Sequence, residues 1–499
     1  MAGIKQLAGQ TIWYGLSNMA AKFLNYFLTP YLTYKLNGES YGDMTLVYSA
    51  IPFLGIIFTY GLETSYFRFI QKDDARHDLY NTVSISIVSS TIFFTLFLWF
   101  FASSIAKVVN VGEHPEYIIL SLLVVSFDTL CRIPFAKLRQ EGRPVKFAFI
   151  SVFGVVVNMI TLYFLLSVAP KLAASNPNSV FTIISSKGYG VTFVLLSNLV
   201  QAIVTWLLLW KEFWSFRWHF NVELWKRIMA YSLPMLIAGL GGMVNETLDR
   251  IMLGWWGVPP AGSDMKFQIG TYGACYKLSI LITIFIQAFR MGAEPFFFKQ
   301  MSGENPQKVY ARVMKFFVIT ICVMFLFVSL YLDIWKQFVQ NPKMWVGLRV
   351  VPILLLANMF LGIYYNLSIW YKVINKTIAG AWITVIGAGI TILINYLFIP
   401  RYGYMASAWA TFTCYGSMMV LSYLWGQKEY PVPYAWKKLV AYIVMVVIIY
   451  FIHHSLTRLW DNRLYSYVLA TLFIFGYVLL ILKIERKEFQ KLPYVGKYI

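Results

Sequence analysis

The feature that most constrains this chain is a series of apolar segments, each long enough to cross a lipid bilayer. About 20 predominantly apolar residues are needed to span the ~30 Å hydrocarbon core of a membrane as a helix. The sequence contains fourteen such segments, and the connections between them are short. They lie at about residues 11–35, 41–62, 82–104, 115–135, 146–168, 189–210, 229–254, 269–291, 314–334, 346–370, 377–399, 403–426, 436–454 and 464–483. We therefore predict an all-α polytopic membrane protein with about 14 transmembrane helices.

The overall composition agrees with a membrane protein and argues against a soluble one. Of the 499 residues, 59% are hydrophobic and 13% are charged, whereas a soluble domain is about half apolar and a quarter charged. The N-terminal residues MAGIKQLAGQTIWYGLSN lack the features of a cleaved signal peptide, so we expect the first apolar segment to be retained. The cysteines show no paired spacing, and neither disulfides nor a metal site are predicted. They are Cys131, Cys275, Cys322 and Cys414.

The Lys and Arg residues are distributed unevenly between the two sides of the predicted bundle. When the N-terminus and every second connection after it are assigned to one side, that side carries 28 of the 42 Lys and Arg residues and the other side carries 12. The remaining two, Lys22 and Lys277, lie within predicted spans. Basic residues accumulate on the cytoplasmic side of membrane proteins, so we expect both termini in the cytoplasm. This excess also accounts for the net charge of +20 without a nucleic-acid partner, which would need a contiguous basic face on a soluble domain.

Short matches between the two halves of the chain indicate an internal repeat. YGLS at 14–17 resembles YSLP at 231–234, and GLETSYFRF at 61–69 resembles GAEPFFFKQ at 292–300. Two further matches keep the same order, and all four offsets lie between 213 and 233 residues. Internal repeats of helical bundles are typical of transporters, whose halves commonly enclose a substrate cleft.

The repeat predicts the domain organisation. We expect an N-terminal lobe of six helices over residues 1–210, a cytoplasmic amphipathic linker over 211–228, a C-terminal lobe of six helices over 229–426, and two additional helices with a tail over 427–499. Because six is even, the two lobes have the same orientation. Their pseudo-two-fold axis is therefore expected along the membrane normal.

Several segments resemble a known family. The residues YSLPMLIAGLGGMVNETLDRIMLG (231–254), IGTYGACYKLSILITIFIQAFRMGAEPFFFK (269–299) and YGYMASA (402–408) resemble spans seven, eight and twelve of polysaccharide-transporter proteins. These proteins are the O-antigen and capsule repeat-unit flippases of the MATE-like multidrug/oligosaccharidyl-lipid/polysaccharide (MOP) exporter superfamily. Fourteen spans and short loops are the family norm, so the resemblance extends over essentially the whole chain.

The resemblance implies a transporter that performs no covalent chemistry. Such a flippase moves a polyprenyl-pyrophosphate-linked oligosaccharide across the bacterial cytoplasmic membrane by alternating access, for O-antigen, capsule or exopolysaccharide biosynthesis. The implied partners are this lipid-linked oligosaccharide, the lipid bilayer, and the polymerase and glycosyltransferases of the pathway. We expect a monomer, no cofactor, no metal and no catalytic residue. Coupling to an H+ or Na+ gradient, or to the membrane potential, stays open.

Two other classes of function fit the sequence less well than a flippase. A MATE-type cation or drug antiporter would need carboxylates deep in its cleft, whereas the first apolar segment carries Lys22 and no acidic residue. A membrane glycosyltransferase or polymerase would need a large external loop with catalytic groups, and the longest predicted outside connection, 170–188, carries no paired carboxylates. Both alternatives are less favoured than the flippase.

Four basic residues are candidates for binding the pyrophosphate. Lys22 lies about eleven residues into the first apolar segment, or ~16 Å along a helix, near the middle of the membrane. An ionisable side chain at that depth is by default a functional candidate. Together with Lys277, Arg290 and Arg132 it would form a basic cleft, in which several cations replace the lost hydration of the anion and arginine can bind it bidentately.

The remaining charged positions are candidates for gates or for the polar lining of the cleft. Asn245, Glu246, Asp249 and Arg250 interrupt one apolar segment, and the last three share a helical face through their i, i+3 and i+4 spacing. They form either a self-neutralising Glu246–Arg250 pair or a gate at the outer mouth. The same two alternatives, a structural ion pair or a gate, apply near the predicted inner ends of other spans. Those candidates are Glu294 beside Arg290, Glu63 with Arg68, and Asp128 beside Arg132.

Overall fold

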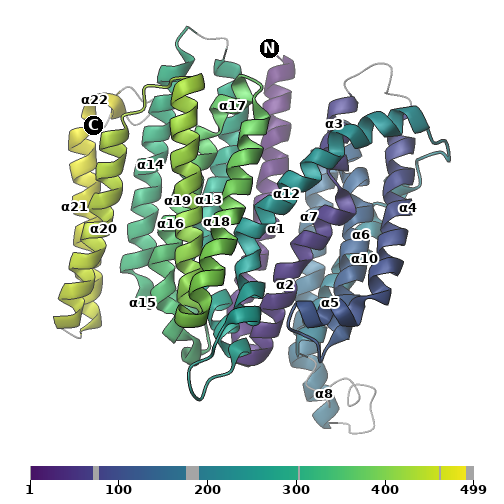
Figure 1. The fold of residues 1–499 in the computed structure, drawn as a ribbon, viewed down its shortest axis with the longest axis horizontal. Coiled ribbons are helices and arrows are strands. Elements are labelled where there is room, and N and C mark those ends of the chain that lie inside the picture. Colours follow the sequence, from purple (N-terminus) through teal and green to yellow (C-terminus); the bar gives the residue numbers. More distant parts are fainter. Residues whose placement is uncertain (1, 71–77, 176–189, 302–303, 460–461, 491–499) are drawn as a thin grey trace. The chain divides into compact units, whose positions relative to one another are not determined.

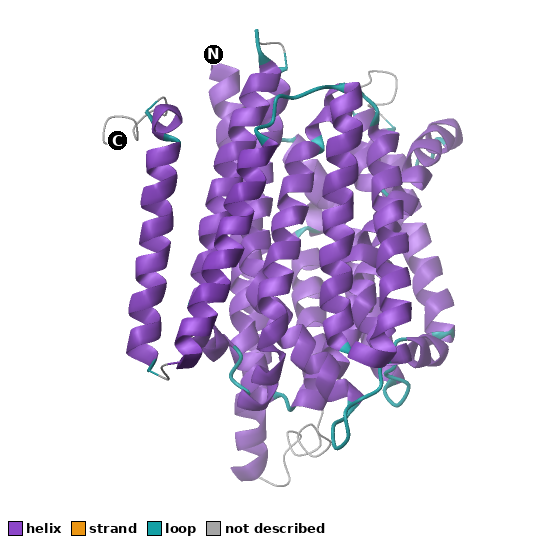
Figure 2. Cartoon of the chain, turned by 60° about the vertical axis from the view of Figure 1, so that its left-hand side comes forward, coloured by secondary structure: helices purple, strands orange, loops and turns teal. Residues whose placement is uncertain are grey.

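The structure is a computed structural model that describes residues 2–70, 78–175, 190–301, 304–459 and 462–490. At residues 2–18, 294–295 and 298–299 it describes the backbone alone. Throughout these ranges the chain forms helices joined by turns and loops, without a β-strand (Figure 2). The predicted all-α fold class is therefore confirmed.

The helices follow the order shown by their labels in Figure 1. Short π and 3-10 segments cover Phe164–Val168, Lys336–Phe338 and Pro342–Val350. The α-helices are α1 (Ala2–Lys35), α2 (Gly38–Thr59), α3 (Leu62–Phe69), α4 (Leu79–Phe100), α5 (Ala102–Val108), α6 (Pro115–Gln140), α7 (Pro144–Tyr163), α8 (Ala169–Ser175), α10 (Gly190–Leu208), α11 (Trp210–Phe213), α12 (Val222–Trp256), α13 (Met265–Gln300), α14 (Pro306–Leu330), α15 (Leu332–Trp335), α16 (Val351–Leu367), α17 (Ile369–Val373), α18 (Thr377–Tyr402), α19 (Tyr404–Glu429), α20 (Trp436–Leu459), α21 (Arg463–Ile484) and α22 (Arg486–Phe489).

Twelve helical segments of the described chain are long and apolar enough to cross a membrane. They coincide with twelve of the predicted spans. The helices α1 and α19 occupy the two remaining predicted positions with 34 and 26 residues, but they are not among the twelve. The chain is thus a multi-pass membrane protein, as predicted, while the number of fourteen spans is not confirmed.

Several helices begin at asparagine residues whose side chains cap the first turn. The Asn37 Oδ1 accepts a hydrogen bond of 2.7 Å from the Ser40 backbone N–H at the start of α2. The Asn221 Oδ1 accepts one of 3.0 Å from the Leu224 backbone N–H at the start of α12. A free backbone N–H at a helix start needs such an acceptor. These short polar residues therefore determine where the apolar helices begin.

The contacts divide the chain into two compact units. Unit 1 comprises Met1–Ala274, Asn341–Met344 and Thr384–Ala410, and unit 2 comprises Cys275–Gln340, Trp345–Ile383 and Thr411–Ile499. Unit 1 thus contains α12, the first helix of the predicted C-terminal lobe, together with α2, α3 and α4. The division into two six-helix lobes stays a prediction.

One apolar core of unit 1 joins the start of α12 to the helices of the first half of the chain. Tyr66 and Leu62 of α3, Val83 of α4 and Ile133 of α6 are all essentially inaccessible to solvent. Ile228 of α12 packs into the same cluster. In a bilayer such close packing stabilises through dispersion contacts rather than through removal from water. The first turns of α12 are therefore held firmly by α3, α4 and α6.

A second contact in unit 1 brings the backbones of α2 and α13 together. A Cβ atom added at Gly42 would lie 1.9 Å from the Lys266 carbonyl oxygen, and one added at Gly270 would lie 2.4 Å from the Gly38 carbonyl oxygen. Only glycine permits this approach. Small residues at such crossings let membrane helices pack through dispersion forces, because lipid offers no hydrophobic drive for their association.

In unit 2, the helices α20 and α21 are attached to α14 through a carboxylate at the end of α21. The Glu485 side chain is 3% exposed, and its two oxygens accept bonds from Lys315 (2.8 Å), Lys438 (3.0 Å) and Tyr442 (2.7 Å). Burial alone would raise the pKa of Glu485, but the bonds from these three side chains lower it below its ordinary value. The ionised carboxylate therefore fastens the C-terminal helix pair to unit 2.

Candidate functional site

Three of the four polar residues that interrupt the apolar sequence of α12 are buried in unit 1. Asn245, Asp249 and Arg250 are 5%, 3% and 7% exposed, whereas Glu246 is exposed. Together with Tyr272 of α13 and Thr391 of α18, the three buried residues form what we call the α12 polar cluster. The charges of Asp249 and Arg250 are tolerated in this apolar segment because they are enclosed by protein rather than by lipid.

The centre of the α12 polar cluster is the Asp249 carboxylate. The Tyr272 hydroxyl donates to its Oδ2 over 2.7 Å, and the Arg250 guanidinium donates to its Oδ1 over 3.1 Å. The Arg250 backbone N–H donates to the same Oδ1 over 2.9 Å. The guanidinium also donates to the backbone oxygen of Glu246 over 2.6 Å. A buried charge pair is tolerable only with such additional hydrogen bonds, because both ions lose their hydration.

Asn245 extends the cluster towards α18. Its amide donates to the Thr384 carbonyl over 3.2 Å, and its Oδ1 accepts a bond of 3.3 Å from the Thr391 hydroxyl. Asn395, one turn further along α18, donates to the Thr391 carbonyl and accepts from the Ser407 hydroxyl of α19 over 2.9 Å. A continuous chain of polar groups thus connects α12, α18 and α19. A gating or lining role of these residues stays a prediction.

A second polar group in unit 1 connects α3 with α6 and α12. Glu63 forms a close ion pair with Arg139, and its other oxygen lies 3.9 Å from Arg132. The Arg68 guanidinium lies 4.0 Å from the centre of the Tyr231 ring of α12. The structure therefore brings Glu63 and Arg132 together. Asp128, the neighbour that the sequence suggested for Arg132, is exposed on α6 and lies within electrostatic range of Arg132. Arg139 was not recognised in the sequence, because it is 76 residues away from Glu63.

The four predicted cleft cations lie on three helices, α1, α6 and α13. Lys22 is exposed on α1 and, like Arg132, belongs to unit 1. Lys277 and Arg290 are half-buried on α13 within unit 2, and the Arg290 guanidinium lies 4.1 Å from the centre of the Tyr365 ring. A common cleft for these side chains stays a prediction. The side chain of Glu294 lies outside the described residues.

Sequence reasoning missed an ion pair at the contact of α2 and α13. The Lys266 ammonium lies 3.1 Å from Oδ1 of Asp43, which is 7% exposed. Asp43 is located inside the apolar segment 41–62, so its charge was a signal that could have been used. Lys266 is 223 residues away in the chain, and spacing rules for one helix cannot predict such a partner.

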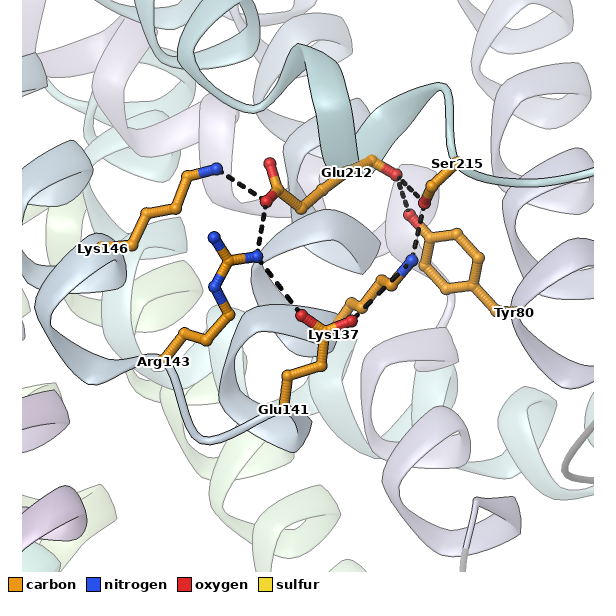
Figure 3. A network of polar contacts seen from close by, with 7 residues as sticks. All are labelled: Tyr80, Lys137, Glu141, Arg143, Lys146, Glu212 and Ser215. Atoms are coloured by element: carbon orange, nitrogen blue, oxygen red, sulfur yellow. Dashed lines mark hydrogen bonds and ion pairs between the residues drawn. The ribbon is translucent and has the colours of Figure 1, made fainter.

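Sequence reasoning also missed a polar network at the linker of unit 1, shown in Figure 3. Glu212 of α11 is 5% exposed, and its Oε1 accepts bonds from Arg143 (3.0 Å) and Lys146 (2.6 Å). Burial alone would raise the pKa of Glu212, but the hydrogen bond from Lys146, a backbone hydrogen bond and the charges of Lys146 and Arg143 lower it. The Tyr80 hydroxyl donates to the Glu212 backbone oxygen. We call this group the Glu212 network.

The fold and these sites together define a class of protein. A helical, multi-pass membrane protein with ion pairs enclosed between its spans is typical of transporters. Across the described ranges no group of three or more His, Cys, Asp and Glu residues is placed to hold a metal ion. Residues 7–301 match the model of a family described as polysaccharide biosynthesis protein, and the chain belongs to this family. The resemblance noted in the sequence is thereby confirmed.

Known proteins similar to this chain agree with this class. A protein of the Lsg locus of Haemophilus influenzae is 20% identical over 401 residues, which cover 78% of this chain and 84% of that protein. The solved structure of the lipid II flippase MurJ, in an inward closed conformation, has a TM-score of 0.71 and 14% identity, covering 96% of this chain and 99% of that one. A multidrug resistance MATE family transporter of the MOP superfamily, in an outward-facing conformation, has a TM-score of 0.57 and 14% identity. The match covers 87% of this chain and 96% of that transporter.

These comparisons establish the type of protein. At such identities the solved structures show that the chain has the fold shared by MurJ and MATE transporters. The family and the structural neighbours are transporters rather than enzymes, which confirms the prediction of a membrane transport protein.

Proposed function

We propose that this protein is a flippase that moves a polyprenyl-pyrophosphate-linked oligosaccharide repeat unit across the cytoplasmic membrane. The observation that carries the proposal is the match of residues 7–301 to the polysaccharide biosynthesis family. The fold shared with a lipid II flippase supports it. The product would be a repeat unit of O-antigen, capsule or exopolysaccharide, delivered to the outer leaflet for polymerisation.

The proposed mechanism requires binding and conformational change but no covalent step. The pyrophosphate and sugars cannot enter hydrocarbon, because an ionised group loses its hydration there at a cost of many kcal/mol. Lys22, Lys277, Arg290 and Arg132 are proposed to replace that hydration on the cytoplasmic side. Alternating access would then expose the sugar head to the outside, while the polyprenyl chain remains in the lipid.

The proposal includes an orientation and an energy source. The Lys and Arg excess supports a cytoplasmic location for both termini and for α11. Transport against a gradient would be coupled to H+, to Na+ or to the membrane potential, which is worth ~2.3 kcal/mol per elementary charge at 100 mV. Because the cargo head is anionic, an interior-negative potential favours its outward movement.

The proposal is tested in cells from which the gene has been deleted. Rescue by wild type should restore surface glycan, whereas Lys22→Ala, alone and with Lys277→Ala, should reduce export and let the lipid-linked intermediate accumulate at unchanged protein level. Losing one charge-assisted contact of this kind costs about 1.5–3 kcal/mol, so the single substitution should slow export roughly 10-fold or more. Lys171→Ala, an exposed lysine of α8, is the matched control.

A reconstituted assay separates the flippase from the other classes. Liposomes containing the purified protein should move a fluorescent lipid-linked oligosaccharide between leaflets without altering its chemical structure. Deletion that leaves surface glycan unchanged but abolishes efflux of a cationic dye would instead assign a MATE-type antiporter. Formation of polymer from lipid-linked units by the purified protein would identify a polymerase.

A further inference from the structure

A groove of about 600 Å³ lies in unit 1 between α2, α4 and the start of α12. Its volume is in the range of small-molecule and lipid sites, which are about 300–1,000 Å³. On α4 it is lined by residues at i, i+4 and i+8, namely Ser86, Ser90 and Phe94. On α12 it is lined by Trp225, Met229 and Leu233 with the same spacing. The groove therefore follows one face of each helix.

Apart from the exposed Ser89, the polar groups in the wall of the groove form hydrogen bonds with one another. The Tyr60 hydroxyl lies 2.8 Å from the Ser86 hydroxyl and 3.1 Å from the Ser90 hydroxyl. The Trp225 indole N–H donates to Ser86 over 3.0 Å. The other lining residues are mainly aliphatic and aromatic. The surface offered to an occupant is thus apolar, and the occupant that fits it is a hydrocarbon chain.

The length and the openness of the groove fit a lipid chain in one leaflet. From Ser86 to Phe94 the α4 face is ~12 Å long, and from Trp225 to Leu236 the α12 face is ~16 Å long at 1.5 Å per residue. One leaflet contributes about half of the ~30 Å hydrocarbon core. Phe93 and Leu233, which line the groove, are 61% and 48% exposed, so the groove opens towards the bilayer.

Basic residues lie near the end of the groove at the linker, where the head group of a bound lipid would be. Trp225 and Phe220 mark the end of the groove at the linker, and indole rings favour the membrane interface. Lys226 and Arg227, which follow Trp225 directly, are both exposed. Each basic residue near an anionic leaflet contributes about 1 kcal/mol of attraction. The start of α12 thus exposes two positive charges against the single negative charge of Glu223, so a lipid phosphate at this end of the groove would meet a net positive charge.

We propose that this groove is a binding site for one anionic phospholipid of the leaflet on the linker side. One of its acyl chains lies between α4 and α12, and its head group lies beside Lys226 and Arg227. The bound lipid fills the space between α4 and α12. None of the four proposed cargo-binding cations lines the groove, and the inference does not depend on which cargo is transported.

The test is native mass spectrometry of the full-length protein taken from nanodiscs of equal parts phosphatidylglycerol and phosphatidylethanolamine. Wild type should retain one phosphatidylglycerol in preference to phosphatidylethanolamine. Ser89→Trp, which fills the groove from an exposed position, should strongly reduce retention, because the indole occupies the space in which the acyl chain would pack. Leu96→Trp, also exposed on α4 but outside the groove, is the control and should retain the lipid.

Two further variants distinguish loss of the lipid site from misfolding of the Ser89→Trp protein. Leu233→Trp fills the groove from α12 and should act like Ser89→Trp. The double variant Lys226→Ala/Arg227→Ala should lose the preference for phosphatidylglycerol, whereas Lys428→Ala/Lys437→Ala, which removes two exposed basic residues elsewhere, should keep it. Equal retention in Ser89→Trp and Leu96→Trp would overturn the site. Equal binding of both phospholipids, or displacement of phosphatidylglycerol by added polyprenyl phosphate at equal concentration, would overturn the assigned occupant.

Discussion

The α12 polar cluster and the Glu212 network are both built on a buried carboxylate, but they differ in the exposure of the cation. Asp249 is 3% exposed, and its partner Arg250 is 7% exposed. Glu212 is 5% exposed, whereas its partners Arg143 and Lys146 have side chains that are 46% and 28% exposed. In the network a cation that loses the carboxylate can turn to water, and in the cluster it cannot. Similar ion pairs should therefore contribute very different amounts to stability.

The largest loss of folding stability is expected for Asp249→Ala. The substitution leaves Arg250 as a buried charge without its carboxylate, which typically costs about 3–5 kcal/mol. The midpoint of thermal unfolding in detergent should fall strongly compared with wild type. Glu246→Gln, an exposed change one turn away, serves as control.

Removing both charges of the α12 polar cluster tests whether the loss of stability comes from the unpaired Arg250. Asp249→Leu/Arg250→Met should recover most of the lost stability, since replacing a buried ion pair by apolar residues is often close to neutral. An Asp249→Ala protein as stable as Glu246→Gln would show that Arg250 reaches water, contrary to its burial.

A smaller effect is expected for Glu212→Gln. The amide keeps the shape and one acceptor but loses the charge, and hydrogen bonds to charged groups contribute about 1.5–3 kcal/mol each. Because Arg143 and Lys146 can be rehydrated, we expect a loss of about 2 kcal/mol in total. Chemical denaturation followed by tryptophan fluorescence measures it. A loss as large as that of Asp249→Ala would remove the proposed difference between the two regions.

The Glu212 network also predicts a dependence on pH. The pKa of Glu212 in the folded protein lies below its ordinary value of 4.5, so its contribution to stability is fully present above that ordinary value. The contribution is lost as the pH falls through the lowered pKa. The difference in unfolding midpoint between wild type and Glu212→Gln should therefore be constant at neutral pH and shrink below about pH 4.5. A difference that grows on acidification would contradict the ionised state.

The smallest effect is expected for Arg143→Ala. The Arg143 side chain is 46% exposed, and Lys146 remains as a partner of Glu212 at 2.6 Å. Partly exposed ion pairs contribute about 0–1 kcal/mol, and high salt should reduce this further. Unfolding midpoints at low and high salt measure it, with Lys171→Ala as a surface control. A loss of stability larger than that of Glu212→Gln would show that Arg143 contributes more to the network than Glu212 does.

The two regions also show how far sequence rules extend. The rule that residues at i and i+4 meet on a helix offered a Glu246–Arg250 pair as one of two alternatives. In the structure the Arg250 guanidinium donates to the adjacent Asp249 and to the backbone oxygen of Glu246. Burial decides between these acceptors, because Asp249 is enclosed and bonded to Tyr272 of α13, whereas Glu246 is exposed. The position of the polar group was predictable, and its internal pairing was not.

Ion pairs between residues of different helices could not be predicted from spacing rules, which apply within one helix. Glu63 meets Arg139, Asp43 meets Lys266, and Glu212 meets Arg143 and Lys146, with separations in the sequence of 66 to 223 residues. The carboxylates themselves were visible in or beside apolar segments. Which cation reaches each of them depends on how the helices pack.

By itself, the sequence determined that this is an all-helical membrane protein of the polysaccharide transporter type, and it placed the helices. These properties follow from local quantities, because a bilayer selects apolar segments by length and a helix satisfies its own backbone hydrogen bonds. Only the tertiary structure decided that α12 packs with α2, α3 and α4, that Asp249 rather than Glu246 is enclosed, and that α4 and α12 leave an apolar groove. Packing and burial bring together residues that are far apart in the chain, and the free energy of each ion pair depends on that environment.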